Sequence, residues 1–351
     1  MLLKEFDYDL PEELIAQEPL PERDMSRLMV VDRSRQTIEH HIFREFPQFL
    51  REGDVLVLNN TRVIPARLLG HKETGGRVEA LLLERREPGI WEAMVKPGRR
   101  VPVGTVLRFD SELRAEVVDR TESGGRILRF FVSRGVDEAG GSTEQLHRDG
   151  VDEIIARVGQ VPLPPYIHKP VQDPERYQTV YAASEGSTAA PTAGLHFTPA
   201  LLERIRAQGV KIAFVTLHVG IATFRPVRTA NIEEHRMHTE RYEIPEETAE
   251  VINSARGRIV CVGTTTARAL ESAAVGKHQV RAVVDETGLY IRPGYEFKIV
   301  DVLVTNFHMP KSTLLIMVSA FAGVELIKKA YQEAISRKYR FLSFGDAMML
   351  C

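Results

Sequence analysis

Four short runs of consecutive apolar residues stand out along the chain, and each is followed by polar residues. Continuous apolar runs of this length are typical of strands that are buried on both faces of a sheet. Between the runs lie stretches with apolar residues at helical spacing, and this alternation predicts an α/β domain with a parallel or mixed sheet. The four predicted strands are 54–58, 211–215, 258–262 and 300–304.

The helical stretches carry recognisable start and stop signals. Thr198 can cap a helix whose first turn holds Pro199, and Gly209 can end it. A short capped helix is also expected at 7–17 and a further strand at 26–31. The other predicted helices are 246–256, 267–274 and a long helical region after 308 that is interrupted near Gly323.

From about 67 to 157 the pattern changes to short strand-like runs separated by Gly and Pro pairs. This sequence pattern is typical of an antiparallel barrel or sandwich. We interpret it as a β-barrel domain inserted into the α/β host. The expected domains are 1–66 with 159–351 for the host and 67–158 for the barrel. The predicted barrel strands are 77–83, 91–95, 105–109, 115–118 and 127–132.

Composition excludes several classes of protein. Hydrophobic residues make up 43% and charged residues 27% of the chain, as in ordinary globular proteins. The net charge of −2 gives no global attraction to a polyanion, so a nucleic-acid partner would need a local basic face. Cys261 and Cys351 cannot form a disulfide framework, and the sequence has neither a signal peptide nor an apolar run of ~18 residues. We expect a cytoplasmic monomer with no membrane association.

Polar residues follow all four predicted strands. In open α/β sheets, ligands bind outside the carboxyl ends of the strands, so these residues are expected to converge on one pocket. A fifth segment, 185–199, is rich in small and hydroxyl residues, carries His196 and runs into a helix N-terminus. The polar residues at the strand ends are Asn59 with Asn60, His218, Thr264 with Thr265, and Asn306 with His308.

Besides an enzyme with its ligand pocket at the strand ends, two further classes of function are compatible with the sequence. His235 and His238 are three residues apart and would share one face of a helix, which suits a metal-dependent hydrolase, although no third ligand is obvious. The barrel by itself would suit a non-catalytic RNA-binding module. A dinucleotide fold is disfavoured because no G-x-G-x-x-G follows a strand.

At the same residues the chain resembles a known family, the S-adenosylmethionine:tRNA ribosyltransferase-isomerases of queuosine biosynthesis. The resemblance runs nearly end to end. Two positions depart from the usual family pattern, since Ala222 stands where Gly is usual and Thr266 where Ser is usual. The segments shared with the family are 8–17, 26–28, 59–63, 177–182, 190–198, 223–227, 262–265 with Arg268 and 271–272, 305–315, 339–341 and 343–347.

The resemblance implies a reaction and its partners. The enzyme would transfer and isomerise the ribosyl part of S-adenosylmethionine onto 7-aminomethyl-7-deazaguanine at the tRNA wobble position. The products would be epoxyqueuosine-tRNA, adenine and methionine. S-adenosylmethionine would be a consumed co-substrate, with no metal and no other cofactor. An α/β domain with an inserted β-barrel is also what the resemblance implies.

This chemistry requires a base for the carbon beside the sulfonium and a proton donor for the departing adenine. Histidine suits both roles because its ordinary pKa of about 6.5 lies near neutral pH. The catalytic candidates are His196, ranked first as the base, His218, His308 and Asp346. Phe197, Phe224 and Phe307 are candidates for cation–π contact with the sulfonium, with core packing as the alternative. The other candidate substrate-binding residues are Asn59, Asn60, Arg62, Thr188, Thr192, Gly194, Thr264, Thr265, Arg268, Asn306 and Lys311, with a structural role as the alternative for Arg268.

Transfer RNA would be bound by lysine and arginine contacts to phosphate. Two groups of basic residues are candidates for this surface, one in the barrel and one near the C-terminus, with a simply solvated face as the alternative. They are Lys96, Arg99 and Arg100, and Lys328, Lys329, Arg337, Lys338 and Arg340.

Overall fold

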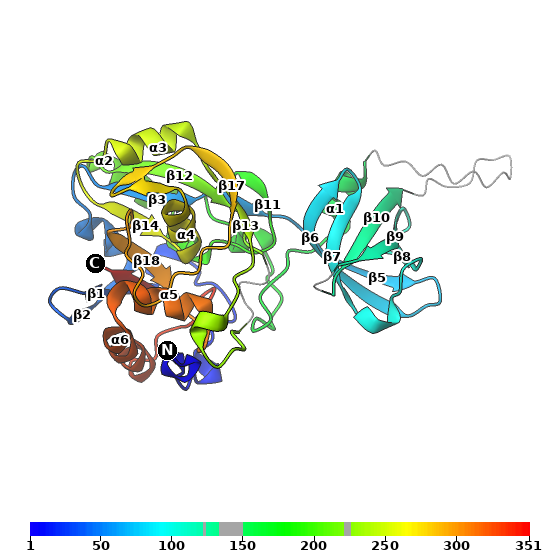
Figure 1. The fold of residues 1–351 in the computed structure, drawn as a ribbon, viewed down its shortest axis with the longest axis horizontal. Coiled ribbons are helices and arrows are strands. Elements are labelled where there is room, and N and C mark those ends of the chain that lie inside the picture. Colours follow the sequence, from blue (N-terminus) through cyan, green and yellow to red (C-terminus); the bar gives the residue numbers. More distant parts are fainter. Residues whose placement is uncertain (122–123, 133–149, 221–225) are drawn as a thin grey trace. The chain divides into compact units, whose positions relative to one another are not determined.

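The computed structural model describes residues 1–121, 124–132, 150–220 and 226–351. The chain divides into two compact units, Met1–Arg62 with Pro164–Cys351, and Val63–Leu163 (Figure 1). The first unit is an α/β domain with a mixed sheet, and the second contains a closed antiparallel barrel. The fold class predicted from the sequence is therefore confirmed.

The host unit is built on one nine-stranded sheet, in the order β17–β13–β12–β3–β14–β18–β19–β1–β2. The strands predicted from the four apolar runs, β12, β3, β14 and β18, are neighbours in this sheet and all run parallel. Their carboxyl ends therefore meet at one edge. The strands are β1 (Arg27–Asp32), β2 (Thr37–Ile42), β3 (Val55–Asn59), β12 (Lys211–Leu217), β13 (Glu240–Ile244), β14 (Ile259–Val262), β17 (Val283–Thr287), β18 (Val302–Asn306) and β19 (Ala347–Leu350).

Both faces of this sheet are covered, which explains the continuous apolar runs. Along β3, Val55 and Val57 enter one core, whereas Leu56 and Leu58 enter the other. The first core packs against α3, α4, α5 and α6, and the second against α2 and the 3-10 helix η4. These helices are η4 (Phe43–Phe49), α2 (Pro199–Ala207), α3 (Glu246–Asn253), α4 (Thr264–Ser272), α5 (Thr313–Ala322) and α6 (Val324–Ser336).

The predicted helix at 7–17 is wrong. The structure has only two short 3-10 turns near this position, η1 (Leu3–Phe6) and η2 (Glu12–Leu14). The main chain pairs with a distant segment instead of with itself. Phe341 donates its N–H to the Leu14 carbonyl, and Ala16 donates to the Phe341 carbonyl. Local capping signals cannot reveal this competing long-range pairing.

Shorter elements connect the main ones. Four of them, β4, β11, η7 and η9, contain or adjoin candidate site residues. They are η3 (Arg23–Met25), β4 (Thr61–Val63), η6 (Pro174–Tyr177), β11 (Ser184–Ser187), η7 (Thr192–His196), η9 (Ile232–Glu234), β15 (Ala274–Gly276) and β16 (Gln279–Val280).

The second unit is a closed barrel with the strand order β10–β7–β6–β5–β8–β9. The predicted barrel strands are present, and the sequence missed β5. Gly70 on β5 allows close strand approach, because a Cβ there would lie 2.4 Å from the Arg108 carbonyl oxygen. The elements are β5 (Arg67–Lys72), β6 (Arg77–Glu87), β7 (Ile90–Lys96), η5 (Gly98–Arg100), β8 (Val106–Arg108), β9 (Leu113–Arg120), β10 (Arg126–Val132) and α1 (Val151–Val158).

Candidate active site

A cavity of about 120 Å³ lies at the carboxyl ends of β14 and β18. This is the edge of an open α/β sheet at which ligands bind. Its lining includes the predicted site residues Thr192, Thr264, Thr265, Asn306, Phe307 and His308. The other lining residues were not among the predicted site residues, although most lie in the segments shared with the family; they are Tyr166, Ala190, Pro191, Ala193, Val219, Pro226, Gly263, Thr305, Met309, Pro310, Ser312, Leu314, Leu342 and Ser343.

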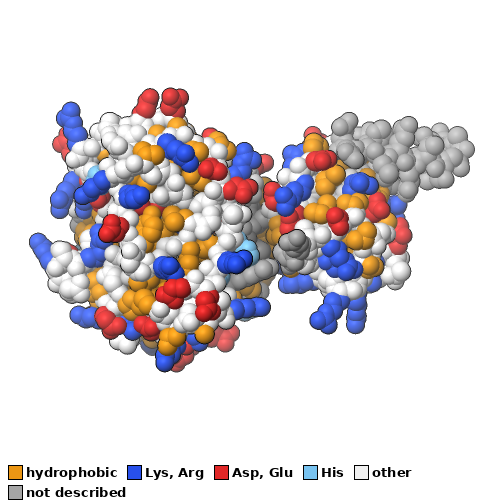
Figure 2. All heavy atoms as spheres, viewed as in Figure 1, with side chains coloured by type: hydrophobic (Ala, Val, Ile, Leu, Met, Phe, Trp, Pro, Cys, Tyr) orange, Lys and Arg blue, Asp and Glu red, His pale blue; other side chains and the backbone are white. Residues whose placement is uncertain are grey.

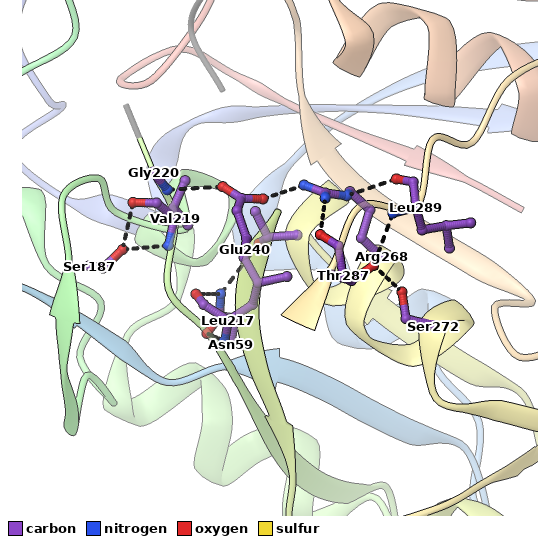
Figure 3. A network of polar contacts seen from close by, with 11 residues as sticks. Asn59, Ser187, Leu217, Val219, Gly220, Glu240, Arg268, Ser272, Thr287 and Leu289 are labelled. Carbon is purple, nitrogen blue, oxygen red and sulfur yellow. Dashed lines mark hydrogen bonds and ion pairs between the residues drawn. The ribbon is translucent and has the colours of Figure 1, made fainter. Parts of the chain in front are cut away.

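The ends of β3 and β12 are joined by two asparagine side chains. Asn59 Oδ1 accepts hydrogen bonds from the N–H groups of Thr61 and Leu217, each at 3.1 Å, and its Nδ2 donates to the Leu217 carbonyl at 3.0 Å. Figure 3 shows Asn59 beside Leu217. Asn60 Oδ1 accepts from the Thr216 hydroxyl at 2.7 Å. Both amides therefore fix the strand ends rather than line the cavity.

His218 lies in the same corner, outside the lining of the cavity. Its Nδ1 is 3.0 Å from the Thr61 hydroxyl, and its ring packs against Gly186, where a Cβ would approach it to 3.0 Å. Burial, together with the charge of Arg241, lowers the pKa of His218. The imidazole is held by the segments around β12.

The start of α4 forms one wall of the cavity. Gly263 precedes it with φ of 92°, a conformation that favours glycine, and no side chain among the described residues caps the helix. The first-turn N–H groups of a helix lack intrahelical partners and favour an electron-rich ligand. Since Thr264 and Thr265 line the cavity, this helix end can bind ligand oxygens there.

His308 is the candidate histidine that lines this cavity. Its Nε2 is 2.9 Å from the Thr305 hydroxyl. Within the described residues no hydrogen-bond partner of Nδ1 is found. Burial lowers the pKa of His308 to about 3, so the ring is neutral at neutral pH. When Nε2 donates to Thr305, Nδ1 carries a free lone pair that can accept a proton, and the lowered pKa makes this ring a weaker base than an exposed histidine.

His196 lies behind the cavity wall, with both ring nitrogens engaged. Its Nδ1 is 2.7 Å from the Ser26 hydroxyl and its Nε2 is 3.1 Å from Asn306 Oδ1. Asn306 Nδ2 donates to the Leu342 carbonyl at 2.9 Å, which leaves Oδ1 to accept from His196 Nε2. Burial lowers the pKa of His196 to about 4. The neutral ring therefore holds the orientation of Asn306, which lines the cavity.

Asp346 is buried and its carboxylate is occupied. Oδ1 accepts from the Arg27 N–H at 2.9 Å, and Oδ2 accepts from Arg27 Nε at 3.1 Å and from the Arg340 N–H at 2.8 Å. These contacts tie the start of β1 to the C-terminal segment. The structure does not bring Asp346 into the lining of the cavity.

Arg268 belongs to a buried ion pair with Glu240, whose side chains are 5% and 6% exposed (Figure 3). The guanidinium also donates to the carbonyls of Leu289 and Thr287, each at 3.2 Å. Glu240 Oε1 accepts the Gly220 N–H at 2.9 Å. The Arg268–Glu240 pair therefore connects α4 with three stretches of main chain. These are the end of β17 at Thr287, the segment at Leu289, and Gly220 after β12.

The two described phenylalanine candidates are fully buried. The Phe197 ring packs against Phe43 and Phe46 at centroid distances of 5.1 Å and 5.8 Å. The Phe307 ring packs against Tyr331 at 5.3 Å and against Phe341 at 5.0 Å. Phe197 therefore matches the core-packing alternative, whereas Phe307 packs in the core and also lines the cavity. Phe224, like Ala222, lies outside the described residues.

The remaining candidate residues do not line the cavity. The Thr188 hydroxyl donates to the Val219 carbonyl at 3.0 Å. A Cβ at Gly194 would lie 2.1 Å from the Tyr181 hydroxyl, so the turn needs glycine. Arg62 pairs with Glu175, and Lys311 pairs with Asp7 at 2.6 Å, in both cases in partly exposed positions.

The pair His235 and His238 does not lie on a helix. The 3-10 helix η9 ends at Glu234, and both imidazoles line a separate cavity of about 80 Å³ that also contains Arg268 and Glu240. Among the described residues no group of three or more His, Cys, Asp or Glu side chains is arranged to hold a metal ion. The helical arrangement expected for a metal site is therefore wrong.

The sequence signals that were missed are recognisable afterwards. Ser312 caps α5 by accepting the Leu315 N–H at 3.1 Å, and its segment follows directly after His308. Tyr166 reaches the cavity from the segment after the barrel, where its hydroxyl is 2.8 Å from the Ser343 hydroxyl. No strand-end rule applies to these loop residues.

None of the helices in the described parts of the chain combines the length and apolar character that a membrane crossing requires.

The chain is similar over its whole length to proteins of one family. The family profile described as "Queuosine biosynthesis protein" matches residues 3–350. The S-adenosylmethionine:tRNA ribosyltransferase-isomerases of Pelotomaculum thermopropionicum and of Caldanaerobacter subterraneus are 54% and 53% identical, with all of both chains covered. A crystal structure of S-adenosylmethionine tRNA ribosyltransferase from Thermotoga maritima is 43% identical, with a TM-score of 0.54 over 99% of this chain and 100% of that one. The chain therefore belongs to the queuosine biosynthesis protein family of S-adenosylmethionine:tRNA ribosyltransferase-isomerases.

Proposed function

We propose that this protein transfers and isomerises the ribosyl moiety of S-adenosylmethionine onto 7-aminomethyl-7-deazaguanine at the tRNA wobble position, and that the cavity beside β14 and β18 binds S-adenosylmethionine. Adenine and methionine leave, and epoxyqueuosine-tRNA is formed. S-adenosylmethionine is consumed, and no further cofactor takes part. The observation that carries the proposal is the full-length similarity to enzymes with this name. A monomeric state and a cytoplasmic location stay predictions.

The chemistry of the lining supports a nucleoside-sulfonium ligand. Thr264, Thr265 and the uncapped start of α4 offer donors to the ribose hydroxyls or the methionine carboxylate. Apolar side chains such as Leu314 and Leu342 exclude water from the rest of the ligand. The cavity thus combines a few polar groups with an apolar wall.

His308 is the residue that we assign to proton transfer. The positive sulfur acidifies the adjacent ribose carbon, and a neutral imidazole beside it can accept that proton. The carbon retains the electron pair, and the resulting imidazolium can donate from Nε2 to the Thr305 hydroxyl, 2.9 Å away. This position favours His308 over His196, which we propose acts on Asn306 from behind the wall.

The tRNA surface is proposed only as far as exposed charge supports it. On the face in Figure 2, lysine and arginine side chains are interspersed with acidic ones. In the C-terminal group, Lys328 pairs with Glu325 at 2.9 Å and Arg337 with Glu333 at 3.0 Å, which weakens that group as a phosphate site. In the barrel, Arg99 and Arg100 lie exposed on η5 next to Lys96. We therefore propose the barrel group as a tRNA contact.

The test is to incubate the purified protein with S-adenosylmethionine and tRNA bearing 7-aminomethyl-7-deazaguanine, and to measure adenine. Adenine release that requires both substrates, with a matching gain in tRNA mass, is the expected result. Unmodified tRNA is the matched control and should give no adenine. If the modified tRNA gives none either, while a related enzyme releases adenine from the same preparation, the proposal is wrong. Replacing His308 by Ala should abolish the release if the proton-transfer assignment is right.

A further inference from the structure

The main chain of His308 is held by two phenols that come from distant parts of the host unit. The Tyr8 hydroxyl donates to the His308 carbonyl, and the His308 N–H donates to the Tyr331 hydroxyl at 3.0 Å. Tyr8 lies between η1 and η2, and Tyr331 lies on α6. Both backbone hydrogen-bonding groups of His308 are therefore satisfied by side chains rather than by a strand or helix.

The two tyrosines support each other. Their ring centroids are 5.1 Å apart with planes at 71°, an edge-to-face packing. Tyr331 is 2% exposed and also packs against Phe307. Burial raises the pKa of both phenols above the ordinary value, so both stay protonated at neutral pH. The hydrogen bonds to His308 are therefore present over the whole working range of pH.

The N-terminal segment is fixed to the loop that follows His308. Lys311 donates its N–H to the Phe6 carbonyl at 2.9 Å, and its ammonium pairs with Asp7 at 2.6 Å. Near the other end of the segment, Leu3 donates to the Ala230 carbonyl at 2.9 Å. These contacts fix the chain directly before Tyr8 to the loop that follows His308.

His308 borders open space on one side, so packing alone does not hold it. Tyr8 and Tyr331 also line a second cavity, of about 440 Å³, together with Leu315 and Ile327. His308 lines the first cavity, and neither tyrosine does. The tyrosine rings are held by each other and by Phe307, so removal of a hydroxyl leaves the rings in place and frees only the main chain of His308, which borders the first cavity.

We propose that Tyr8 and Tyr331 are positioning residues, which hold His308 where Nδ1 meets the carbon beside the sulfonium. The inference rests on the proposed function, in which His308 accepts that proton. The phenols touch the main chain of His308, and Thr305 touches Nε2 of its ring, so together they fix both parts of the residue. A proton acceptor that is displaced by about 1 Å can lose roughly a hundredfold in rate.

The test uses Tyr8→Phe and Tyr331→Phe, which keep the aromatic packing and remove only the hydroxyls. We expect kcat for adenine release to fall roughly ten- to hundredfold in each, with little change in the KM for S-adenosylmethionine. The kinetic isotope effect on kcat, measured with S-adenosylmethionine deuterated at the ribose carbon bonded to sulfur, should rise above the wild-type value. Proton transfer then limits the rate more strongly.

The matched control is Tyr295→Phe. Its hydroxyl donates to Glu271 Oε2 at 3.1 Å, away from the lining of both cavities, so both kcat and the isotope effect should stay at the wild-type value. The inference is overturned if both tyrosine variants retain wild-type kcat, or if kcat falls with an unchanged isotope effect. It is also overturned if His308→Ala releases adenine at the wild-type rate. A wild-type protein that releases no adenine contradicts the proposed function itself.

Discussion

His196 donates a hydrogen bond from Nε2 to Asn306 Oδ1 at 3.1 Å, from behind the wall of the cavity that Asn306 lines. Burial lowers the pKa of His196 to about 4 and that of His308 to about 3. Two buried neutral histidines therefore flank one strand end. Because both rings are neutral in the folded protein, their protonation makes the stability of the host unit depend on pH.

The stability of the protein should fall as the pH is lowered from 6.5 towards 4. In the unfolded chain both histidines bind protons below pH 6.5, whereas the folded protein resists protonation until about pH 4 for His196. The unfolded state thus binds more protons in this window, and His196 alone contributes about 3 kcal/mol that is complete above pH 6.5. Urea titrations at pH 7, 5.5 and 4 measure the slope.

Two substitutions test the source of that slope. His196→Gln removes one titrating group and should flatten the dependence of the unfolding free energy on pH. His71→Gln, on the exposed face of the barrel strand β5, should leave the dependence unchanged. Equal slopes for the wild type and His196→Gln would exclude this histidine as the cause.

Asn59→Leu should destabilise the host unit severely. The amide satisfies the N–H groups of Thr61 and Leu217 and the Leu217 carbonyl, and leucine leaves all three buried groups without a partner. We expect a loss of roughly 3–5 kcal/mol in the free energy of unfolding, measured by urea titration.

Asn253→Leu is the matched control for Asn59→Leu. That amide makes a similar clamp on the main chain of Val280, outside the cavity lining. Both variants should lose stability, and at low temperature only Asn59→Leu should weaken binding of S-adenosylmethionine. Unchanged binding in Asn59→Leu would mean that the strand ends tolerate the loss without moving the cavity.

The buried pair Arg268 and Glu240 should behave as one unit. Arg268→Met leaves a buried carboxylate uncompensated, and Glu240→Gln leaves a buried guanidinium, so each should cost about 3–5 kcal/mol. The double variant should lose less than the sum of the two, which a double-mutant cycle in urea detects. The exposed pair of Arg206 with Glu203 should show little coupling. Strict additivity at Arg268 and Glu240 would contradict this interpretation.

The sequence predicted the centre of the fold better than its edges. The runs at β3, β12, β14 and β18 are buried on both faces, so their composition alone identifies them as strands. Their carboxyl ends share one edge of the sheet, but only the polar residues after β14 and β18 line the cavity. β13 alternates buried and exposed residues, a signal that was present and passed over. The helix predicted at 7–17 failed because its main chain pairs with Phe341, which no local pattern reveals.

Within the site, the sequence identified the segments but not the orientation of each side chain. His196 and Thr192 both lie in η7, yet Thr192 lines the cavity whereas His196 faces Ser26 behind the wall. One 3-10 turn separates the two outcomes. The phenol contacts of Tyr8 and Tyr331 depend on tertiary packing between the N-terminal segment, the loop at His308 and α6. Periodicity carries no information about such contacts.

The glycine before α4 provides a test that separates backbone strain from ligand binding. Gly263 and Gly323 have nearly the same conformation, with φ of 92° in both and ψ of 147° and 140°. Alanine at either position forces a side chain into a region that is almost restricted to glycine, so each substitution should cost about 1–3 kcal/mol in unfolding free energy.

Only Gly263→Ala should impair binding of S-adenosylmethionine. A Cβ at Gly263 would lie 3.6 Å from the Thr265 hydroxyl and 3.8 Å from Ala193, so contact is tolerable but the start of α4 must shift to relieve the strain. Gly323 lies at the junction of α5 and α6, with nothing within 4 Å of its Cβ position. Calorimetric titration should show roughly tenfold weaker binding for Gly263→Ala, the equivalent of about 1.4 kcal/mol, and wild-type affinity for Gly323→Ala. Equal affinity in both variants would mean that the N-terminus of α4 does not bind the ligand.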